Sequence, residues 1–213
     1  IFFGTANGEW YLTVTPVFGH KNGTATITVT VSDGTNSVGT NFVFTVNPPP
    51  ASWARFYNSS AITIPDAGVA APYPSVINVT GRSGTITNMT LTLSKFSHNR
   101  VQDVNMLLVG PTTNLVIFSH ISGGNRSATN VTVHLSDAAF FPLPDNFALW
   151  SEPLWPTAYL PETSFPAPAP VAAPYGTNRF APTFNGTAAN GTWSLYVYDE
   201  TAGVGGGIAA GWG

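Results

Sequence analysis

Apolar and polar residues alternate with a period of two over much of this chain. The clearest run covers residues 24–31, where threonine takes one set of alternate positions and Ala, Ile and Val take the other. Successive side chains of a strand point to opposite faces, so this pattern predicts a half-buried antiparallel strand. Residues 10–15 and 42–46 alternate in the same way, and residues 32–35 have the composition of a turn between two strands. Residues 1–47 therefore predict about four strands, which is half of an immunoglobulin-like sandwich.

A run of prolines marks a predicted domain boundary. Prolines 48–50 donate no backbone hydrogen bond and favour an extended linker over residues 48–53. Alternation resumes in residues 54–213, and residues 104–109 are apolar at nearly every position, which predicts a central strand covered on both faces. Because no segment shows a convincing 3.6-residue period, helix should be limited to a turn or two. The predicted fold class is all-β, with a partial sandwich at 1–47 and a second sandwich at 54–213.

Residues 141–182 differ in composition from the rest of the second domain. Ten of the eighteen prolines fall here, centred on Phe165-Pro166-Ala167-Pro168-Ala169-Pro170. Such a segment cannot lie inside a sheet. It is predicted to be a long, stiff loop that lies across the sandwich with its aromatic side chains tucked in, and the alternative is a proline-rich ligand for a partner domain.

Composition excludes several classes of function. Only 8% of residues are charged and the net charge is −3, which is the wrong sign for neutralising phosphates, so nucleic-acid binding is not expected. No apolar run reaches the roughly 18 residues that span a bilayer. The absence of cysteine removes thiol catalysis, disulfides and thiolate metal sites. The sequence begins without an initiator Met and contains no signal-like stretch with a basic start and an apolar centre, so we expect Ile1 to be a processed or truncated beginning.

Candidate catalytic and metal-binding residues are few. Four histidines occur, but no G-x-S-x-G elbow marks a nucleophile and no HExxH motif marks a zinc site. The Gly-rich residues 205–210 match a dinucleotide motif only by composition, and His134 is expected on the exposed polar face of its strand. Calcium prefers oxygen ligands, which makes the acids of the second domain its candidate ligands. These acids include Asp103, Asp137, Asp145, Asp199 and Glu200, and the candidate ligands among them are Asp103, Asp137 and Asp199. Against calcium, no D-x-D-x-D run concentrates these acids, and Asp199 and Glu200, as strand neighbours, should point to opposite faces.

Asparagine carries a stronger signal. The glycosylation pattern N-x-S/T begins at eight of seventeen asparagines, about twice the number that the Ser and Thr content predicts by chance. Sugars would also add solubility to a chain with so few charges. The alternative is that Thr-rich strands and Asn-Gly-Thr turns produce the pattern as a by-product. The candidate sites are Asn22, Asn58, Asn78, Asn88, Asn125, Asn130, Asn185 and Asn190.

Two motifs of the second domain resemble those of a known family. Residues 97–111 read Ser-His-Asn-Arg-Val-Gln-Asp-Val-Asn-Met-Leu-Leu-Val-Gly-Pro, and residues 190–199 read Asn-Gly-Thr-Trp-Ser-Leu-Tyr-Val-Tyr-Asp. With Gly-Ile-Ala-Ala-Gly-Trp at 207–212, they resemble the P domain of subtilisin-like proprotein convertases. Residues 1–47 resemble the latter half of bacterial cadherin-like or immunoglobulin-like repeats.

The resemblance implies a jelly-roll-like β-sandwich at 54–213 that is not catalytic in itself and brings no active-site residues. It makes Asp103 a natural ligand where such domains bind calcium. The chain departs from the bacterial pattern at Ser119-His120 and Ser136-Asp137, and both departures remove carboxylates. The protease domain of true convertases is absent from these 213 residues.

The sequence therefore predicts a non-catalytic, extracellular or cell-surface structural protein of a bacterial assembly. We expect it to be glycosylated and to associate with other protein subunits. The β-folds left unfinished at both ends of the sequence favour either polymerisation by β-strand complementation into a fibre or surface layer, or a fragment of a longer chain. The alternatives are an accessory P domain of a secreted protease and a carbohydrate-binding module. An exposed Trp53, Trp150 or Trp155 would favour sugar binding, whereas Trp193 alternates with core residues and should be buried.

Overall fold

The computed structural model describes residues 2–6, 9–14, 22–47, 53–160, 164–172 and 179–213. The chain divides into two compact units, Ile1–Ala54 and Arg55–Gly213. Strands dominate both units, so the all-β fold class predicted from the sequence is confirmed. Most of the predicted linker lies outside the described residues.

The described residues of unit 1 form two antiparallel strand pairs. Strand β1 (Phe2–Ala6) pairs with β2 (Glu9–Thr13), and β3 (Gly23–Ser32) pairs with β4 (Ser37–Val46). The second hairpin has ten paired positions, from Gly23↔Val46 to Ser32↔Ser37. Its turn is closed by Asp33, whose carboxylate accepts hydrogen bonds from the backbone amides of Thr35 and Asn36 at 2.9 and 2.7 Å.

The alternation of β3 produces two different faces, but neither face is well buried. Val31 and Val38 lie opposite each other near the turn and are 65% and 72% exposed. Phe42 is also exposed on this apolar face, and Val43 is exposed on the threonine face. The sequence predicted a half-buried strand. The strand is confirmed, but the structure leaves much of its apolar side uncovered by described residues.

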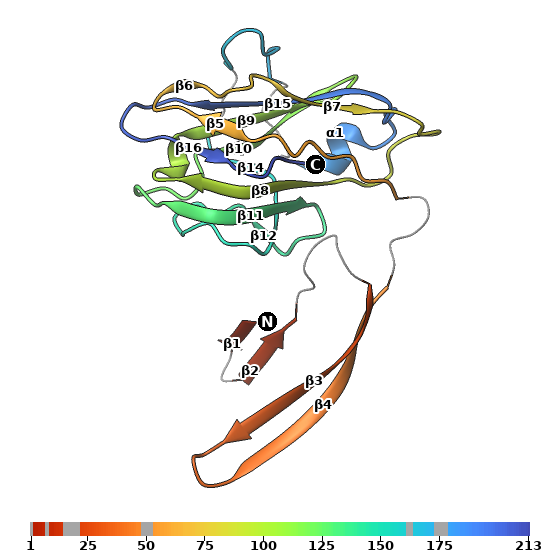
Figure 1. Ribbon diagram of the computed structural model, residues 1–213, viewed down its shortest axis with the longest axis vertical. Helices are drawn as coiled ribbons and strands as arrows, with labels where there is room; N and C mark the ends of the chain where they lie inside the picture. Colours follow the sequence, from red (N-terminus) through yellow and green to blue (C-terminus); the bar gives the residue numbers. More distant parts are fainter. Residues whose placement is uncertain (1, 7–8, 15–21, 48–52, 161–163, 173–178) are drawn as a thin grey trace. The chain divides into compact units, whose positions relative to one another are not determined.

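Unit 2 contains two six-stranded sheets that lie face to face (Figure 1). The first sheet has the order β14-β10-β9-β15-β6, and β7 also pairs with β15. All neighbours are antiparallel except β10 and β14. The bounds of its strands are β6 Gly68–Val69, β7 Ser75–Val79, β9 Val104–Val109, β10 Asn114–Ser119, β14 Thr157–Ala158 and β15 Gly191–Asp199.

The second sheet has the order β12-β13-β11-β8-β16-β5. Its central pair, β8 and β11, is antiparallel and closely matched in length, whereas β13 is parallel to both of its neighbours. The bounds of its strands are β5 Ile62–Ile64, β8 Thr90–His98, β11 Ala128–Ser136, β12 Phe141–Pro142, β13 Pro153–Trp155 and β16 Gly206–Ile208.

The hydrophobic core lies between these two sheets. Leu93 and Phe96 of β8 and Met106 and Leu108 of β9 are fully buried there, and Trp193 is 7% exposed, as the sequence predicted. Such burial contributes roughly 1.5–3 kcal/mol per large apolar side chain. Residues Val104–Leu108 of β9 are all buried and Val109 is half-buried, so the prediction of a central strand covered on both faces is confirmed.

The proline-rich segment covers the outer face of the first sheet. Phe165 is 7% exposed and its ring packs edge-on against Tyr198 of β15, with the ring centroids 5.2 Å apart. Ala172 is buried in the same small apolar cluster. The hydroxyl of Tyr73 donates a hydrogen bond to the Pro166 carbonyl at 2.8 Å. The predicted loop across the sandwich with a tucked-in aromatic side chain is therefore confirmed for residues 164–172.

The prediction that residues 141–182 cannot lie inside a sheet is wrong, because β12, β13 and β14 belong to this segment and β13 lies between β12 and β11. Such short strands place few prolines in the hydrogen-bonded ladder, which is why a proline-rich segment can supply them.

The Gly-rich segment near the carboxyl end serves close packing. Strand β16 lies between β8 and β5, and a Cβ atom on Gly206 would lie 2.1 Å from the Ser97 carbonyl oxygen. A Cβ atom on Gly207 would lie 2.8 Å from the Ile62 carbonyl oxygen. The glycines thus allow β16 to fit between its neighbours. This close packing explains the glycine-rich sequence that matches the dinucleotide motif at residues 205–210.

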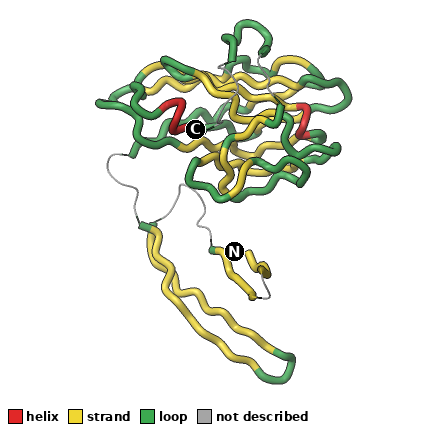
Figure 2. The backbone as a smooth tube through the Cα atoms, turned by 180° about the vertical axis from the view of Figure 1, so that it is seen from behind, coloured by secondary structure: helices red, strands yellow, loops and turns green. Residues whose placement is uncertain are grey.

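Helix is confined to two short segments of the described chain (Figure 2). They are the 3-10 turn η1 (Val101–Asp103) and α1 (Phe180–Phe184), as the missing helical periodicity predicted. Neither of these described helices has the length and apolar character needed to cross a bilayer.

Candidate functional site

A buried histidine and a buried aspartate join the two sheets of unit 2 at one end. His98 ends β8 of the second sheet and Asp199 ends β15 of the first. The His98 Nε2 atom lies 3.0 Å from Asp199 Oδ2, and both side chains are fully buried. His98 Nδ1 lies 2.7 Å from the Arg100 carbonyl oxygen. A buried charge or dipole of this kind must be paired, and here each group supplies the partner of the other.

Arg100 and Asp103 extend this pair toward the surface. Arg100 Nη1 lies 3.4 Å from Asp103 Oδ2, and the Asp103 side chain is 4% exposed. Burial raises the pKa of Asp103, the charge of Arg100 partly lowers it again, and the negative charge of Asp199 raises it further. We call His98, Arg100, Asp103 and Asp199 the inter-sheet cluster.

A second set of polar side chains, centred on Glu200, adjoins the inter-sheet cluster on the opposite face of β15. Glu200 accepts a hydrogen bond from Asn105 Nδ2 at 3.0 Å and lies 2.9 Å from His120 Nε2. The hydroxyl of Ser119 lies 2.8 Å from His120 Nδ1. The prediction that Asp199 and Glu200 point to opposite faces is therefore confirmed, because Asp199 binds His98 and Glu200 binds this second group.

The second group has the connectivity of a serine-histidine-acid relay, yet its serine is not accessible. If Nε2 of His120 donates to Glu200, Nδ1 is free to accept the Ser119 hydroxyl proton. Such a relay activates a serine only where substrate can reach the oxygen. Ser119 is 0% exposed, and its hydroxyl also lies within 3.4 Å of the Leu160 carbonyl. Glu200 is thereby held between Asn105 Nδ2 and His120 Nε2.

The three candidate calcium ligands do not all meet. Asp103 and Asp199 are neighbours in the inter-sheet cluster. Asp137 instead follows β11, and its two carboxylate oxygens accept the backbone amides of Phe180 and Ala181 at 3.0 and 2.7 Å, at the start of α1. Among the described residues, no group of three or more His, Asp or Glu side chains has the arrangement of a metal site.

The candidate glycosylation sites differ in how free their amides are. Asn58 is half-buried, and its Nδ2 atom donates to the Val76 carbonyl at 2.9 Å. Asn190 is exposed, but its amide is held on both sides by the backbone of Arg82, at 2.6 and 2.9 Å. Six further sites are exposed: Asn22, Asn78, Asn88, Asn125, Asn130 and Asn185.

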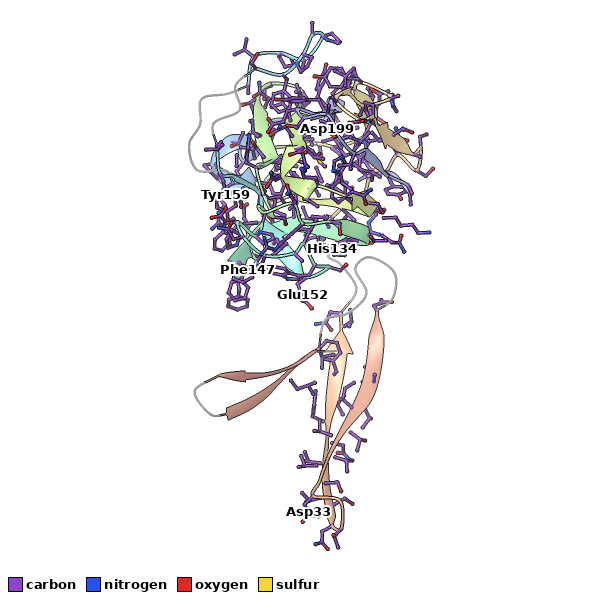
Figure 3. The ribbon with its side chains drawn as sticks, turned by 90° about the vertical axis from the view of Figure 1, so that its left-hand side faces the viewer. Asp33, His134, Phe147, Glu152, Tyr159 and Asp199 are labelled. Atoms are coloured by element: carbon purple, nitrogen blue, oxygen red, sulfur yellow. The ribbon has the colours of Figure 1, made fainter. Side chains whose placement is uncertain are left out.

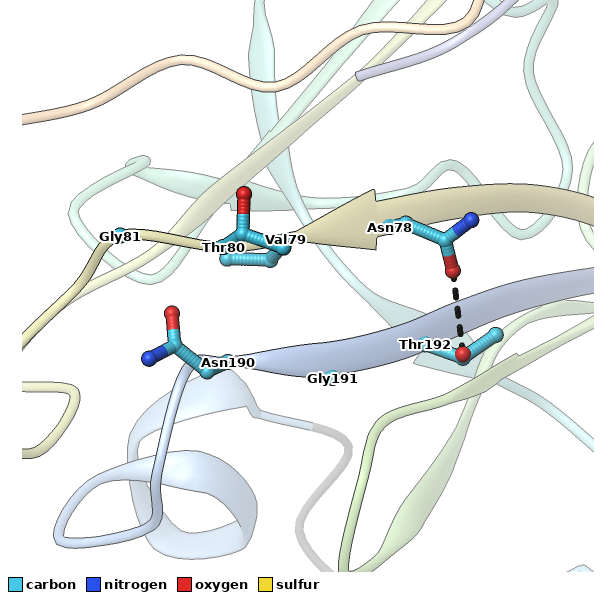
Figure 4. Close-up of a pocket in the computed structure, with 7 residues that line it drawn as sticks. All are labelled: Asn78, Val79, Thr80, Gly81, Asn190, Gly191 and Thr192. Carbon is cyan, nitrogen blue, oxygen red and sulfur yellow. Dashed lines mark hydrogen bonds between the residues drawn. The ribbon is translucent and has the colours of Figure 1, made fainter.

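Two of these sites line a shallow pocket where β7 meets β15 (Figure 4). Thr192 lies opposite Asn78 in the strand register and donates a hydrogen bond to Asn78 Oδ1 at 3.0 Å. Thr80 and Asn190 complete the polar lining of this pocket. Each of the two N-x-T patterns thus contributes to one exposed ladder of amides and hydroxyls.

His134 is less exposed than its polar strand face predicted. It lies opposite Thr92 in β8, and Nδ1 is 3.2 Å from the Thr92 hydroxyl. Burial lowers its pKa, and the nearby carboxylate of Glu152 partly offsets this effect. Figure 3 shows His134 well separated from Asp199 within unit 2. The difference arises because a strand at the centre of a sheet receives side chains from both neighbours.

The three tryptophans that would indicate a sugar-binding surface differ in their exposure. Trp53 is 56% exposed. Trp150 and Trp155 are half-buried, and the Arg179 guanidinium lies 3.8 Å above the Trp155 ring. One of the three possible stacking platforms is therefore open.

Sequence reasoning named Asp103 and Asp199 as candidates but did not place His98 beside them. His98 and Asp199 are 101 positions apart, and no spacing rule joins them. The available signal was the resemblance, since the motifs at 97–111 and 190–199 contain His98, Asp103 and Asp199. Comparison of the chain with protein-family models, characterised proteins and solved structures finds no match. The resemblance to P domains stays a prediction.

Proposed function

We propose that this chain is a non-catalytic structural and interaction protein of a bacterial extracellular or cell-surface assembly. In this proposal unit 2 is a rigid scaffold, and unit 1 joins subunits by accepting a β-strand. Glycans on exposed asparagines keep the charge-poor surface hydrated. The P-domain likeness of unit 2 is part of the proposal and supplies its expected jelly-roll topology.

The observation that carries the proposal is the contrast between the sheet edges of the two units. In unit 2 the edge strands have two to five residues, and β5 is closed by reciprocal backbone hydrogen bonds between Thr63 and Ala71 at 2.9 Å. Strands β3 and β4 of unit 1 each have ten residues, and each hydrogen-bonds along one edge only among the described residues.

Natural proteins protect long sheet edges with charges, prolines or bulges, because an open edge pairs with any strand that meets it. The β3–β4 hairpin has none of these devices. Its ten pairs follow one another without a register shift, residues 22–47 contain no proline, and Asp33 at the turn is their one charged residue (Figure 3). An isolated two-stranded hairpin is also marginally stable at best, so a further strand would stabilise unit 1.

Sedimentation velocity of the full chain over about a hundredfold range of concentration tests this proposal. We expect the wild-type chain to form oligomers as concentration rises. Val31→Lys should shift association to at least about tenfold higher concentration, because it places a charge on the exposed apolar face. Val171→Lys is the matched control, since Val171 is 82% exposed on unit 2 and should leave association unchanged.

A chain that stays monomeric over the whole range would contradict the proposal. So would oligomers that respond equally to the two lysine variants, because their contacts would then lie outside the hairpin.

Carbohydrate binding is a second candidate, favoured by the exposed ring of Trp53. Exposed tryptophan rings suit stacking on sugars. Isothermal titration with soluble polysaccharides should then detect binding that Trp53→Ala abolishes and that Trp155→Ala, beneath Arg179, leaves largely intact. An unchanged titration with Trp53→Ala would remove this candidate.

A further inference from the structure

Strand β3 alternates regularly between threonine and aliphatic residues. Threonine occupies positions 24, 26, 28 and 30, and Ala25, Ile27, Val29 and Val31 lie between them. Among the described residues, β3 hydrogen-bonds to β4 alone, so its other edge is open. The question is which strand this edge accepts, and this deepens the proposed function, on which it rests.

When two copies of a strand pair antiparallel, the residue numbers of every opposed pair add up to the same sum, and this sum defines the register. If the sum is odd, each threonine faces an aliphatic residue and the two faces of the sheet become mixed. If the twofold axis passes through Thr28, the polar face pairs Thr28 with Thr28 and Thr26 with Thr30. The apolar face then pairs Ile27 with Val29, so both faces stay uniform.

Charge and backbone geometry agree with this register. No charged side chain lies on β3, so two copies meet without repulsion. A Thr28-centred ladder covers residues 24–32 and leaves out Gly23, whose φ of 150° departs from strand geometry. Strand β4 suits a ladder less well, because Gly39 and Asn41 interrupt its β-branched and aromatic residues.

We propose that two copies of this chain join through β3, antiparallel about Thr28, to form a four-stranded sheet in the order β4-β3-β3-β4. The joined sheet has one continuous apolar face and one threonine face. A twofold contact of this kind is isologous, so each copy contributes the same edge.

Cysteine cross-linking tests the register directly, because the chain has no cysteine of its own. In the proposed ladder the two Cα atoms at position 28 are about 4.5–5.5 Å apart, within the range of a disulfide. The two copies of position 30 are about 14 Å apart, beyond that range. Under mild oxidation of the full chain, Thr28→Cys should give at least about tenfold more covalent dimer than Thr30→Cys.

A mixture of Thr26→Cys and Thr30→Cys supplies the internal control. Positions 26 and 30 oppose each other in the proposed register, so the mixture should form a mixed dimer although each variant alone forms little. Equal cross-linking at 28 and 30 would overturn the register. If wild-type chains oligomerise but Thr28→Cys does not cross-link, the proposed function survives and this inference fails, because another segment or protein occupies the edge. Monomers throughout would overturn both.

Discussion

At the scale of single residues, several polar side chains of unit 2 are more constrained by hydrogen bonds or burial than their sequence pattern predicts. Asn58 and Asn190 belong to glycosylation patterns, yet the backbone carbonyls of Val76 and Arg82 accept hydrogen bonds from their amides. His134 lies on a polar strand face and is still half-buried. The glycosylation of these asparagines and the protonation of His134 should therefore depend on contacts that the sequence pattern does not show.

Glycan occupancy should follow the state of the amide nitrogen. A sugar on Asn58 would replace an N–H that donates to Val76 in a half-buried position, so Asn58 should be unmodified in the native protein. Asn88 and Asn125 are exposed and should carry sugars where the protein is glycosylated. Peptide mass spectrometry of native material measures each site separately. A glycan on Asn58 with bare Asn88 and Asn125 would contradict this order.

His134 should make unit 2 less stable in mild acid. Its pKa in the folded protein is lowered by burial, so the unfolded chain takes up the proton first as the pH falls below about 6.5. The stability that the neutral imidazole provides is therefore present above that pH and is lost below it. Urea unfolding at pH 5 and pH 8 should show a smaller difference for His134→Gln than for wild type. An identical difference would show that His134 does not carry the effect.

At the scale of the elements, the sequence predicted strands better than it predicted what covers them. Uniform apolar character identified the buried strand β9, and proline identified the loop over the first sheet. Alternation identified β3 equally well, but alternation reports which face is apolar and says nothing about the presence of a covering layer. The inter-sheet cluster could not be predicted from spacing, because β8 and β15 bring His98 and Asp199 together only through the fold.

The close fit of β16 makes Gly206 sensitive to the smallest side chain. Gly206→Ala would place Cβ 2.1 Å from the Ser97 carbonyl and 2.6 Å from the His98 ring. Overpacking of this kind costs about 1–3 kcal/mol or more, so the unfolding midpoint of unit 2 should fall clearly. Denaturant titration followed by fluorescence of the buried Trp193 and Trp212 measures this. Gly39→Ala in unit 1, whose nearest contact would be an ordinary 3.4 Å, is the control.

Removal of the aromatic anchor should release the proline-rich segment. Phe165→Ala deletes the ring that packs on Tyr198 and should cost about 3 kcal/mol. Tyr73, whose pKa burial raises to about 12, should then become more exposed and titrate closer to 10 by ultraviolet absorbance. Val171→Ala in the same segment should change stability by less than about 0.5 kcal/mol, because its side chain is 82% exposed. Equal effects of the two variants would contradict the anchoring role.

At the scale of the whole molecule, the two units differ in what they need from a partner. Unit 2 encloses a core between two sheets, and its edge strands are short. Unit 1 presents a ten-pair hairpin with exposed apolar residues. Among the described residues, the backbone of β3 forms hydrogen bonds with β4 only. The proposal assigns the scaffold role to unit 2 and the joining role to unit 1 because of this difference.

The measurement that tests this central claim most directly is hydrogen–deuterium exchange of the full chain at low and high protein concentration. In a two-stranded sheet, the β3 amides that point away from β4 exchange freely, and a paired copy would protect them. The account predicts that peptides covering residues 23–32 gain protection as concentration rises, while peptides of β15 stay unchanged. Exchange in β3 that does not depend on concentration, in a sample that sedimentation shows to be oligomeric, would contradict it.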